Sequence, residues 1–308
     1  MFNHLHGHST FSFLEAIGKP LAIINKAKEL EMASIAITDY NGMYGIIKFY
    51  QQANDAGIKP LIGIETGFVM DINSNIVESQ IWNIVVLATN KQAYQNLMEL
   101  TSFANKEGLA MKPKIDLAAL QKFGEGMICF FWWTDSRLGK MISLDEKESK
   151  IIEIIGMIQN AVGKDHVFLE IIAQEYKYFP ELKKVNEFVT QIADKEHIPC
   201  IIGNNFFYPD KTDKQAWEVA LSIKDGTKIY DENRRKPKWA YHIMTEDEIR
   251  NICKKNGMDD TFITTCIEQN NKIADSIDVQ IDLHQSLFPA YETPDDIREM
   301  YEEHMKKN

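Results

Sequence analysis

The chain has 308 residues, 44% of them hydrophobic, which is enough for one large α/β domain or two smaller ones with a buried core. Its formal net charge of −11 at pH 7 argues against a surface that coats nucleic acid in general, because neutralising phosphates needs a concentration of Lys and Arg. No apolar run approaches the roughly 18 to 20 residues that span a bilayer, and the first residues lack a signal-peptide profile, so we expect a cytoplasmic protein.

Short apolar runs alternate with amphipathic segments over roughly the first 200 residues. Runs rich in Ile, Val, Leu or Phe predict strands at residues 4–8, 34–38, 60–64, 84–88, 127–132, 167–171 and 198–202. Apolar residues at three- and four-residue spacing predict helices at residues 20–31, 44–56, 92–104, 146–162 and 181–197. Because strands that alternate with helices pair in parallel, the order favours a closed or nearly closed β/α barrel over an open doubly wound sheet, although periodicity alone does not separate the two.

The character of the chain changes after residue 202. Residues 204–209 are prone to turns, and a helix is expected at 211–223, ended by Asp225 and Gly226. The spacing of Thr245 and Glu248 is that of a capping box and predicts the start of another helix. Further helices are expected at about 260–277 and at 294–307, and the basic island at 234–238, beside Trp239, is interpreted as a solvated loop.

The cysteines contain no Cys-x-x-Cys pair and are scattered along the chain, at Cys129, Cys200, Cys253 and Cys266. This spacing argues against a zinc ribbon and against a disulfide framework. We therefore expect ordinary thiols.

Three histidines occupy alternate positions at the N-terminus: His4, His6 and His8. Residues two apart on a strand point to the same face, so these imidazoles are expected to project side by side. Imidazole is a frequent metal ligand, and a nearby carboxylate would complete a divalent-metal site. The alternative is a solvated strand end. In a barrel, chemistry lies at the carboxyl ends of the strands, where Asp39 and Glu65 are also expected, so these side chains are predicted to converge.

Three passages, at residues 4–15, 36–45 and 56–65, resemble the polymerase-and-histidinol-phosphatase (PHP) domain in order and spacing. They are most similar to the version at the N-terminus of bacterial DNA polymerase III alpha subunits. Later passages, at residues 87–97, 168–170 and 213–226, fit the same family. The similarity covers the whole chain.

The resemblance implies a distorted seven-stranded β/α (TIM-like) barrel of the PHP type with a C-terminal helical extension. Residues 1–285 would form this domain, and residues 286–308 would begin the linker or palm region of a longer polymerase. In such a barrel the strand ends hold divalent metals for phosphoester hydrolysis. The palm carboxylates that would hold two magnesium ions are expected beyond this chain, so DNA polymerisation is not expected in it.

Carried over by resemblance, His6 and His8 match the first pair of metal ligands, Glu15 stands where an Asp is usual, and Glu65 matches the family's glutamate. These four residues are expected to hold at most one divalent ion (Zn, Mn or Mg), weakly. The alternative is that they hold none and form hydrogen bonds among themselves and with water.

Other pocket positions mostly depart from the family pattern. Asp39 is retained, but Tyr40, Asn83, Asn205 and Phe207 replace expected ligands. The ring of a tyrosine or phenylalanine fills the space of a ligand, and an asparagine oxygen binds metal more weakly than an imidazole or a carboxylate. A complete hydrolytic centre is therefore not expected.

Two functions of different classes are compatible with this pattern. The first is a structural PHP module of a replicative polymerase, with little or no phosphoesterase activity, that braces the rest of the polymerase chain, docks a proofreading exonuclease subunit and meets DNA only through the full-length protein. The second is a stand-alone metal-dependent phosphoesterase or 3′–5′ exonuclease. The loss of ligands favours the first, and neither involves a membrane.

Overall fold

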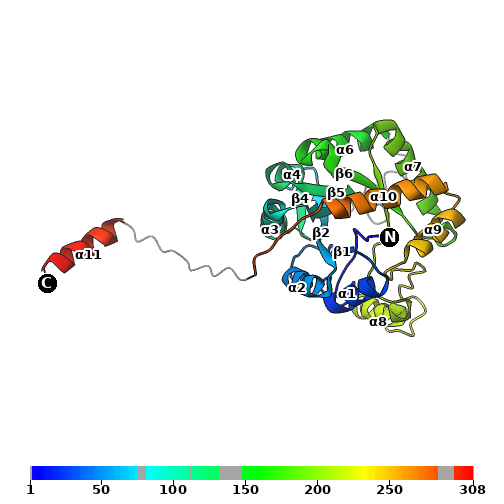
Figure 1. Cartoon of the computed structure of the whole chain (residues 1–308), viewed down its shortest axis with the longest axis horizontal. Helices are drawn as coiled ribbons and strands as arrows, with labels where there is room; N and C mark the ends of the chain where they lie inside the picture. Colours follow the sequence, from blue (N-terminus) through cyan, green and yellow to red (C-terminus); the bar gives the residue numbers. More distant parts are fainter. Residues whose placement is uncertain (1, 75–80, 111, 132–147, 284–294, 308) are drawn as a thin grey trace.

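The computed structural model describes residues 2–74, 81–110, 112–131, 148–283 and 295–307, which form a curled sheet covered by helices (Figure 1). The strands are β1 (Ser34–Ile37), β2 (Lys59–Val69), β3 (Trp82–Ala88), β4 (Lys114–Asp116), β5 (Met127–Phe131), β6 (Val167–Ile172) and β7 (Cys200–Gly203). Their order is β1-β2-β3-β5-β6-β7, and β4 pairs with β2. Every residue of β1, β5 and β6 is buried, as expected for strands covered on both faces. The predicted distorted, TIM-like seven-stranded α/β barrel is confirmed.

The helices lie mainly outside the sheet (Figure 1). They are α1 (Pro20–Glu29), α2 (Ile46–Ala56), α3 (Lys91–Lys106), α4 (Leu117–Phe123), α6 (Glu148–Val162), α7 (Pro180–Glu196), α8 (Lys214–Lys224), α9 (Glu246–Lys255), α10 (Asp260–Ser276) and α11 (Asp295–Lys307), with short 3-10 turns η2 (Lys164–His166), η3 (Tyr176–Tyr178) and η4 (Lys211–Asp213). In α2, Ile46, Phe49, Tyr50 and Ala53 are buried at helical spacing. The predicted capping box is present at the start of α9, where Thr245 and Glu248 each accept a backbone N–H.

The N-terminal segment joins the two ends of the sheet. His4 forms an isolated parallel bridge with Ile35 in β1, and Gly7 forms one with Phe206, just after β7. A Cβ atom on Gly7 would lie 2.0 Å from the Phe206 ring, so this close approach requires glycine. The segment predicted as a regular strand at residues 4–8 thus pairs through single bridges, which bring the histidines beside both β1 and β7.

The expectation of uniformly parallel pairing is wrong at β3. This strand runs antiparallel to both β2 and β5, whereas β1–β2, β2–β4, β5–β6 and β6–β7 are parallel. A parallel neighbour needs a crossover, usually through a helix, and the sequence showed no helical pattern between β2 and β3. The short elements β4 and α4 were also absent from the sequence prediction.

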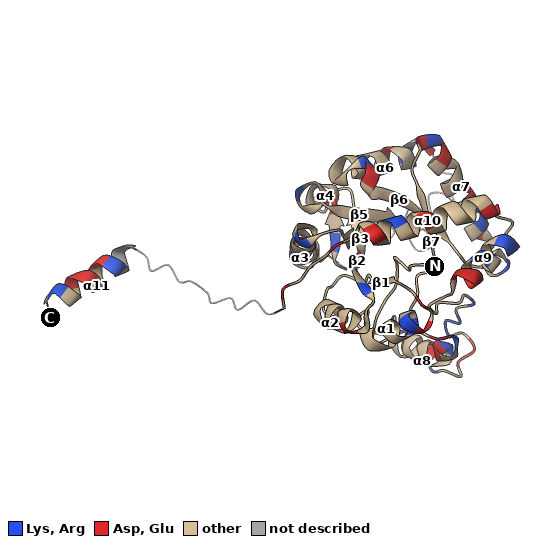
Figure 2. Ribbon diagram, in the orientation of Figure 1, with Lys and Arg blue, Asp and Glu red and all other residues tan. Residues whose placement is uncertain are grey.

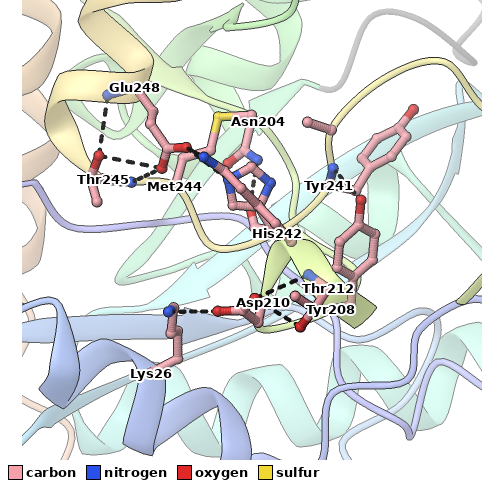
Figure 3. A network of polar contacts seen from close by, with 12 residues as sticks. Lys26, Asn204, Tyr208, Asp210, Thr212, Tyr241, His242, Met244, Thr245 and Glu248 are labelled. Atoms are coloured by element: carbon pink, nitrogen blue, oxygen red, sulfur yellow. Dashed lines mark hydrogen bonds and ion pairs between the residues drawn. The ribbon is translucent and has the colours of Figure 1, made fainter. Parts of the chain in front are cut away.

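The irregular chain after β7 is fastened by polar contacts (Figure 3). The Asn204 amide donates to the His242 carbonyl (2.9 Å), and Lys26 of α1 pairs with Asp210 (2.8 Å). His242 lies 3.2 Å from Glu248 of α9. These contacts fix the segment over residues 204–245 against the barrel.

Charged residues of both signs lie on the outer helices, and the sheet carries few (Figure 2). On α11, the apolar side chains of Ile297, Met300, Tyr301 and Met305 are all exposed. Among the described residues, none of the helices has the length and apolar character needed to cross a bilayer.

Candidate metal centre

Two histidines and one glutamate converge inside the barrel. His6 and His8 come from the N-terminal segment, and Glu65 comes from the middle of β2; all three are buried. The Nε2 atoms of His6 and His8 lie 2.9 and 3.1 Å from Glu65 Oε2. One potential ligand atom from each residue lies within 4.8 Å of the other two. The predicted convergence of these three side chains is therefore observed.

The remaining polar atoms of the group have partners that fix its orientation. His6 Nδ1 lies 3.0 Å from Glu170 Oε2, and His8 Nδ1 lies 3.0 Å from Ser12 Oγ. The Asn83 amide donates to Glu65 Oε1 (2.8 Å). Carboxylates and hydroxyls that hold the far nitrogen of an imidazole direct its other nitrogen toward a metal or a proton.

The carboxylates govern the charge on His6. Burial would lower the pKa of His6, but the adjacent Glu170 and Glu65 raise it to about 9. Burial would raise the pKa of Glu65, but hydrogen bonds from His6 and His8 lower it to about 2. Burial raises the pKa of Glu170. With no ion bound, His6 is therefore protonated at neutral pH and donates to both carboxylates, and an ion on its Nε2 atom would replace the proton there.

Asp39 is held by hydroxyl and backbone donors. Its carboxylate accepts from the Ser9 backbone N–H (2.7 Å), the Ser9 hydroxyl (2.6 Å) and the Ser12 hydroxyl (2.7 Å). The three hydrogen bonds fasten the turn that carries Ser9 and Ser12 to the end of β1. Asp39 does not belong to the group of converging ligand atoms formed by His6, His8 and Glu65.

Two aromatic rings lie against His8. The centroids of the Tyr40 and Phe207 rings are 4.2 and 4.8 Å from that of the imidazole, and their planes are inclined to it by 23° and 15°. Both rings occupy positions where the sequence predicted altered ligands. They place aromatic ring volume on both sides of the proposed ligand His8.

Glu15 lies apart from the buried group. Its carboxylate forms an ion pair with Lys224 of α8, and its carbonyl accepts from Trp217 Nε1 (2.6 Å). It lines a polar pocket of about 520 Å³ together with Tyr40, Asn83 and Lys224. Because Tyr40 contacts His8 and Asn83 contacts Glu65, this pocket borders the buried group.

Comparison with known proteins places this geometry in a family. The family model described as "PHP domain" matches residues 4–174. The chain belongs to the PHP domain family. Over 95% of its length, this PHP domain is 31% identical to the DNA polymerase III subunit alpha of Borreliella burgdorferi, and over 81% it is 30% identical to that of Thermus aquaticus. It spans 25% and 21%, respectively, of those proteins.

Among solved structures, a putative metal-dependent phosphoesterase from Bifidobacterium adolescentis aligns with a TM-score of 0.43 and 12% identity, over 84% of this chain and 98% of that one. An amidohydrolase from Chromobacterium violaceum aligns with the same TM-score and 16% identity, over 68% of this chain and 87% of that one. Similarity at this level adds no argument about the site.

The buried group of this PHP domain fits one divalent ion. Two imidazole nitrogens and one carboxylate oxygen form the donor set of many zinc and transition-metal sites, which complete their coordination with water. His6, His8 and Glu65 are the one such group found among the described residues. Asp39, which accepts three hydrogen bonds from Ser9 and Ser12, lies outside this group.

Two residues of the PHP domain extend what the sequence indicated. Glu170 was not among the predicted site residues, although a lone carboxylate in the otherwise apolar strand Val167–Ile172 was a usable signal. Asn205 is fully buried two residues after β7, and neither atom of its amide has a hydrogen-bond partner among the described residues. A buried amide of this kind requires a water molecule or a ligand.

Proposed function

We propose that this chain is the N-terminal PHP domain of a bacterial DNA polymerase III alpha subunit, with a degenerate metal centre, and that it braces the polymerase and docks a proofreading exonuclease. One observation carries the proposal. The similarity to alpha subunits covers 95% of the chain in the first relative and so continues well past residue 174, where the family match ends. That extent takes in β7 and the helices after it, which the family match leaves out.

The geometry supports a degenerate centre. The Tyr40 and Phe207 rings lie against His8, and the Asn83 amide donates a hydrogen bond to Glu65. The Asp39 carboxylate accepts hydrogen bonds from serine hydroxyls. Each of these groups occupies a place that a multi-metal phosphoesterase would use for a ligand. The remaining ligands, His6, His8 and Glu65, suffice for one ion. Phosphoester hydrolysis by a metal cluster needs further ions, which bind both the nucleophile and the phosphate.

A single ion would be held by His6, His8 and Glu65. When bound, such an ion supplies Lewis acidity and an acidified water molecule. The chain itself would contribute orientation, since Glu170 holds His6 and Ser12 holds His8.

The partners follow from the same proposal. Helix α11 would belong to the linker or palm region that begins after residue 285. It would pack on the remainder of the polymerase through its exposed apolar side chains, Ile297, Met300, Tyr301 and Met305. The exonuclease subunit would dock on the barrel, DNA would be contacted by the full-length protein, and the complex would work in the cytoplasm.

A second candidate function is a metal-dependent phosphoesterase or 3′–5′ exonuclease. The observation that favours it is the converging group of His6, His8 and Glu65 beside a polar pocket lined by Lys112 and Lys224, whose positive charges suit a phosphate. This candidate function requires that a metal ion stimulate hydrolysis of a phosphoester by the chain. The structural role requires no hydrolysis.

Two observations test the proposed function. The reading frame that encodes the chain is expected to continue past Asn308 into a polymerase body. The full-length protein, mixed with the exonuclease subunit of the same organism, is expected to co-elute with it in gel filtration. A stop codon after Asn308, or an exonuclease that binds equally well to an alpha subunit lacking residues 1–285, would contradict it.

A further inference from the structure

A second pocket, of about 320 Å³, lies between η3 and the chain that precedes α9. Four aromatic side chains and two lysines account for most of its lining: Tyr178, Phe179, Trp239, Tyr241, Lys236 and Lys238. None of these residues lines the polar pocket at Glu15. Its volume is near the lower end of the roughly 300–1,000 Å³ typical of small-molecule sites, so it suits about one planar group.

The aromatic wall of this pocket is held by hydrogen bonds. The buried Gln174 side chain donates to the Ala240 carbonyl (2.6 Å) and accepts from the Ala240 N–H (3.3 Å). The next N–H along, that of Tyr241, donates to the Tyr208 hydroxyl (3.1 Å; Figure 3). The Phe179 ring packs edge-on to Trp239, with centroids 4.9 Å apart. Because its backbone is fixed from two sides, the pocket exists before any ligand arrives.

Trp239, on the wall of this pocket, carries a buried hydrogen-bond donor. Trp239 is only 7% exposed, and its indole Nε1 is buried with no acceptor among the described residues. Indole N–H is a donor only, and buried donors are normally paired. Because this nitrogen is closed to solvent, Trp239 serves the pocket as part of its apolar wall.

The positive charge at the rim is also uncompensated. In the basic island at 234–238, Arg234 pairs with Glu218 (2.8 Å) and Arg235 pairs with Asp225 (2.9 Å). Lys236 and Lys238 are exposed and form no ion pair within the described parts of the chain. The island is thus divided into two arginines that fasten the loop and two lysines that remain available for an anion.

We propose that this pocket binds one nucleotide unit of single-stranded nucleic acid. The base stacks on the exposed rings of Tyr178 and Phe179, and the phosphate lies on Lys236 and Lys238. Sequence-tolerant strand binding combines these elements, since every base has a π-face and each phosphate needs a cation. An acidic peptide would use the lysines and leave the aromatic wall without a matching surface. The proposal does not depend on exonuclease docking or on the metal centre.

The experiment measures binding of a fluorescein-labelled oligo(dT) to the purified chain by fluorescence anisotropy at low salt, with thymidine monophosphate as competitor. The double variant Lys236→Ala/Lys238→Ala is expected to weaken binding by about tenfold or more and to reduce its salt dependence. Tyr178→Ala, at an exposed position that leaves the core intact, is expected to weaken it by about tenfold through lost stacking.

The matched control is Lys48→Ala/Lys91→Ala, which removes two exposed lysines from another face and should leave binding unchanged. Competition by the monophosphate at micromolar concentration identifies a free nucleotide as a ligand, whereas competition by oligonucleotides alone identifies a strand; either result supports the pocket. Absence of binding by the unaltered chain, equal loss in the control variant, or competition by poly-glutamate as effective as by oligonucleotide would overturn the proposal.

Discussion

The imidazole of His8 and the phenol ring of Tyr40 lie nearly parallel, with centroids 4.2 Å apart and planes inclined by 23°. Tyr40 follows Asp39 at the end of β1, and its backbone N–H donates to Ser12 Oγ (3.0 Å), the same atom that lies 3.0 Å from His8 Nδ1. The ring and the backbone of Tyr40 therefore both act on His8. The ring of Tyr40 thus fills space directly beside the proposed metal centre.

Returning an imidazole to this position should strengthen metal binding. In Tyr40→His, the new side chain lies beside His8 and adds a nitrogen ligand to the set formed with His6 and Glu65. We expect zinc or manganese to raise the melting temperature of this variant by several degrees, because ligands that bind only the folded state stabilise it by mass action. The unaltered chain and the control Tyr40→Phe should shift barely at all. A large shift in all three proteins would mean that Tyr40 does not limit the site.

The close approach of Gly7 to Phe206 predicts a large cost for a single methyl group. Gly7→Ala places a Cβ atom 2.0 Å from the Phe206 ring and should lower the free energy of unfolding by roughly 1–3 kcal/mol. Gly156→Ala in α6 is the matched control, because a Cβ there meets nothing within 4 Å and helical Ala is favoured over Gly by roughly 0.5–1 kcal/mol. Urea denaturation measures the free energy of unfolding of both variants and of the unaltered chain. Equal stability of the two variants would show that the N-terminal segment does not close the barrel.

The contacts of Glu248 predict a pH dependence of stability. Burial alone would raise the pKa of Glu248, but its contacts with Lys211, the Thr245 N–H and His242 lower it to about 2. A carboxyl whose pKa is lowered on folding stabilises the protein above its unfolded pKa of 4.5 and loses that contribution as the pH falls towards 2.

The difference in unfolding free energy between the unaltered chain and Glu248→Gln should therefore be largest at pH 6 to 7 and shrink below about pH 4.5. Urea titrations at several pH values measure it. The exposed Glu232→Gln is the control and should show no such trend. A difference that stays constant from pH 7 to pH 3 would contradict the assigned contacts.

The exposed helix α11 should be removed by protease before the barrel is cut. Its side chains from Ile297 to Lys306 are all exposed, and its apolar positions have no cover among the described residues. Limited trypsin digestion should cleave after Arg298 or Lys306 while a fragment that retains the residues before Gln285 persists. Protection of α11 at trypsin concentrations that already cut the loop at 234–238 would show that this helix packs on the barrel.

Local patterns in the sequence predicted much of the fold. The apolar runs marked six of the seven strands, and the Thr245–Glu248 spacing marked the start of α9 because both partners of a capping box lie within one turn. The direction of β3 was missed, because strand direction depends on the connection, and β2 extends to Val69 before the chain returns. The local preference of residues for strand structure does not determine which strands pair or in which direction.

For the site, the convergence of His6, His8 and Glu65 followed from placing strand ends together in a barrel. The roles of Glu170 and Ser12 were not foreseen, because each depends on which ring nitrogen faces which neighbour. The same holds for Glu15, whose pairing with Lys224 depends on the position of α8. Contacts between residues far apart in the chain require coordinates.

The most direct test of a degenerate centre is the rate of phosphate release from a nitrophenyl ester by the purified chain, measured with manganese, zinc or magnesium. The variant His8→Ala is measured in parallel, with Lys48→Ala as a control for purity and folding. We expect the three proteins to show the same low rate with each metal, because His6, His8 and Glu65 provide for one ion only. Metal-stimulated release that His8→Ala abolishes and Lys48→Ala retains would contradict the account.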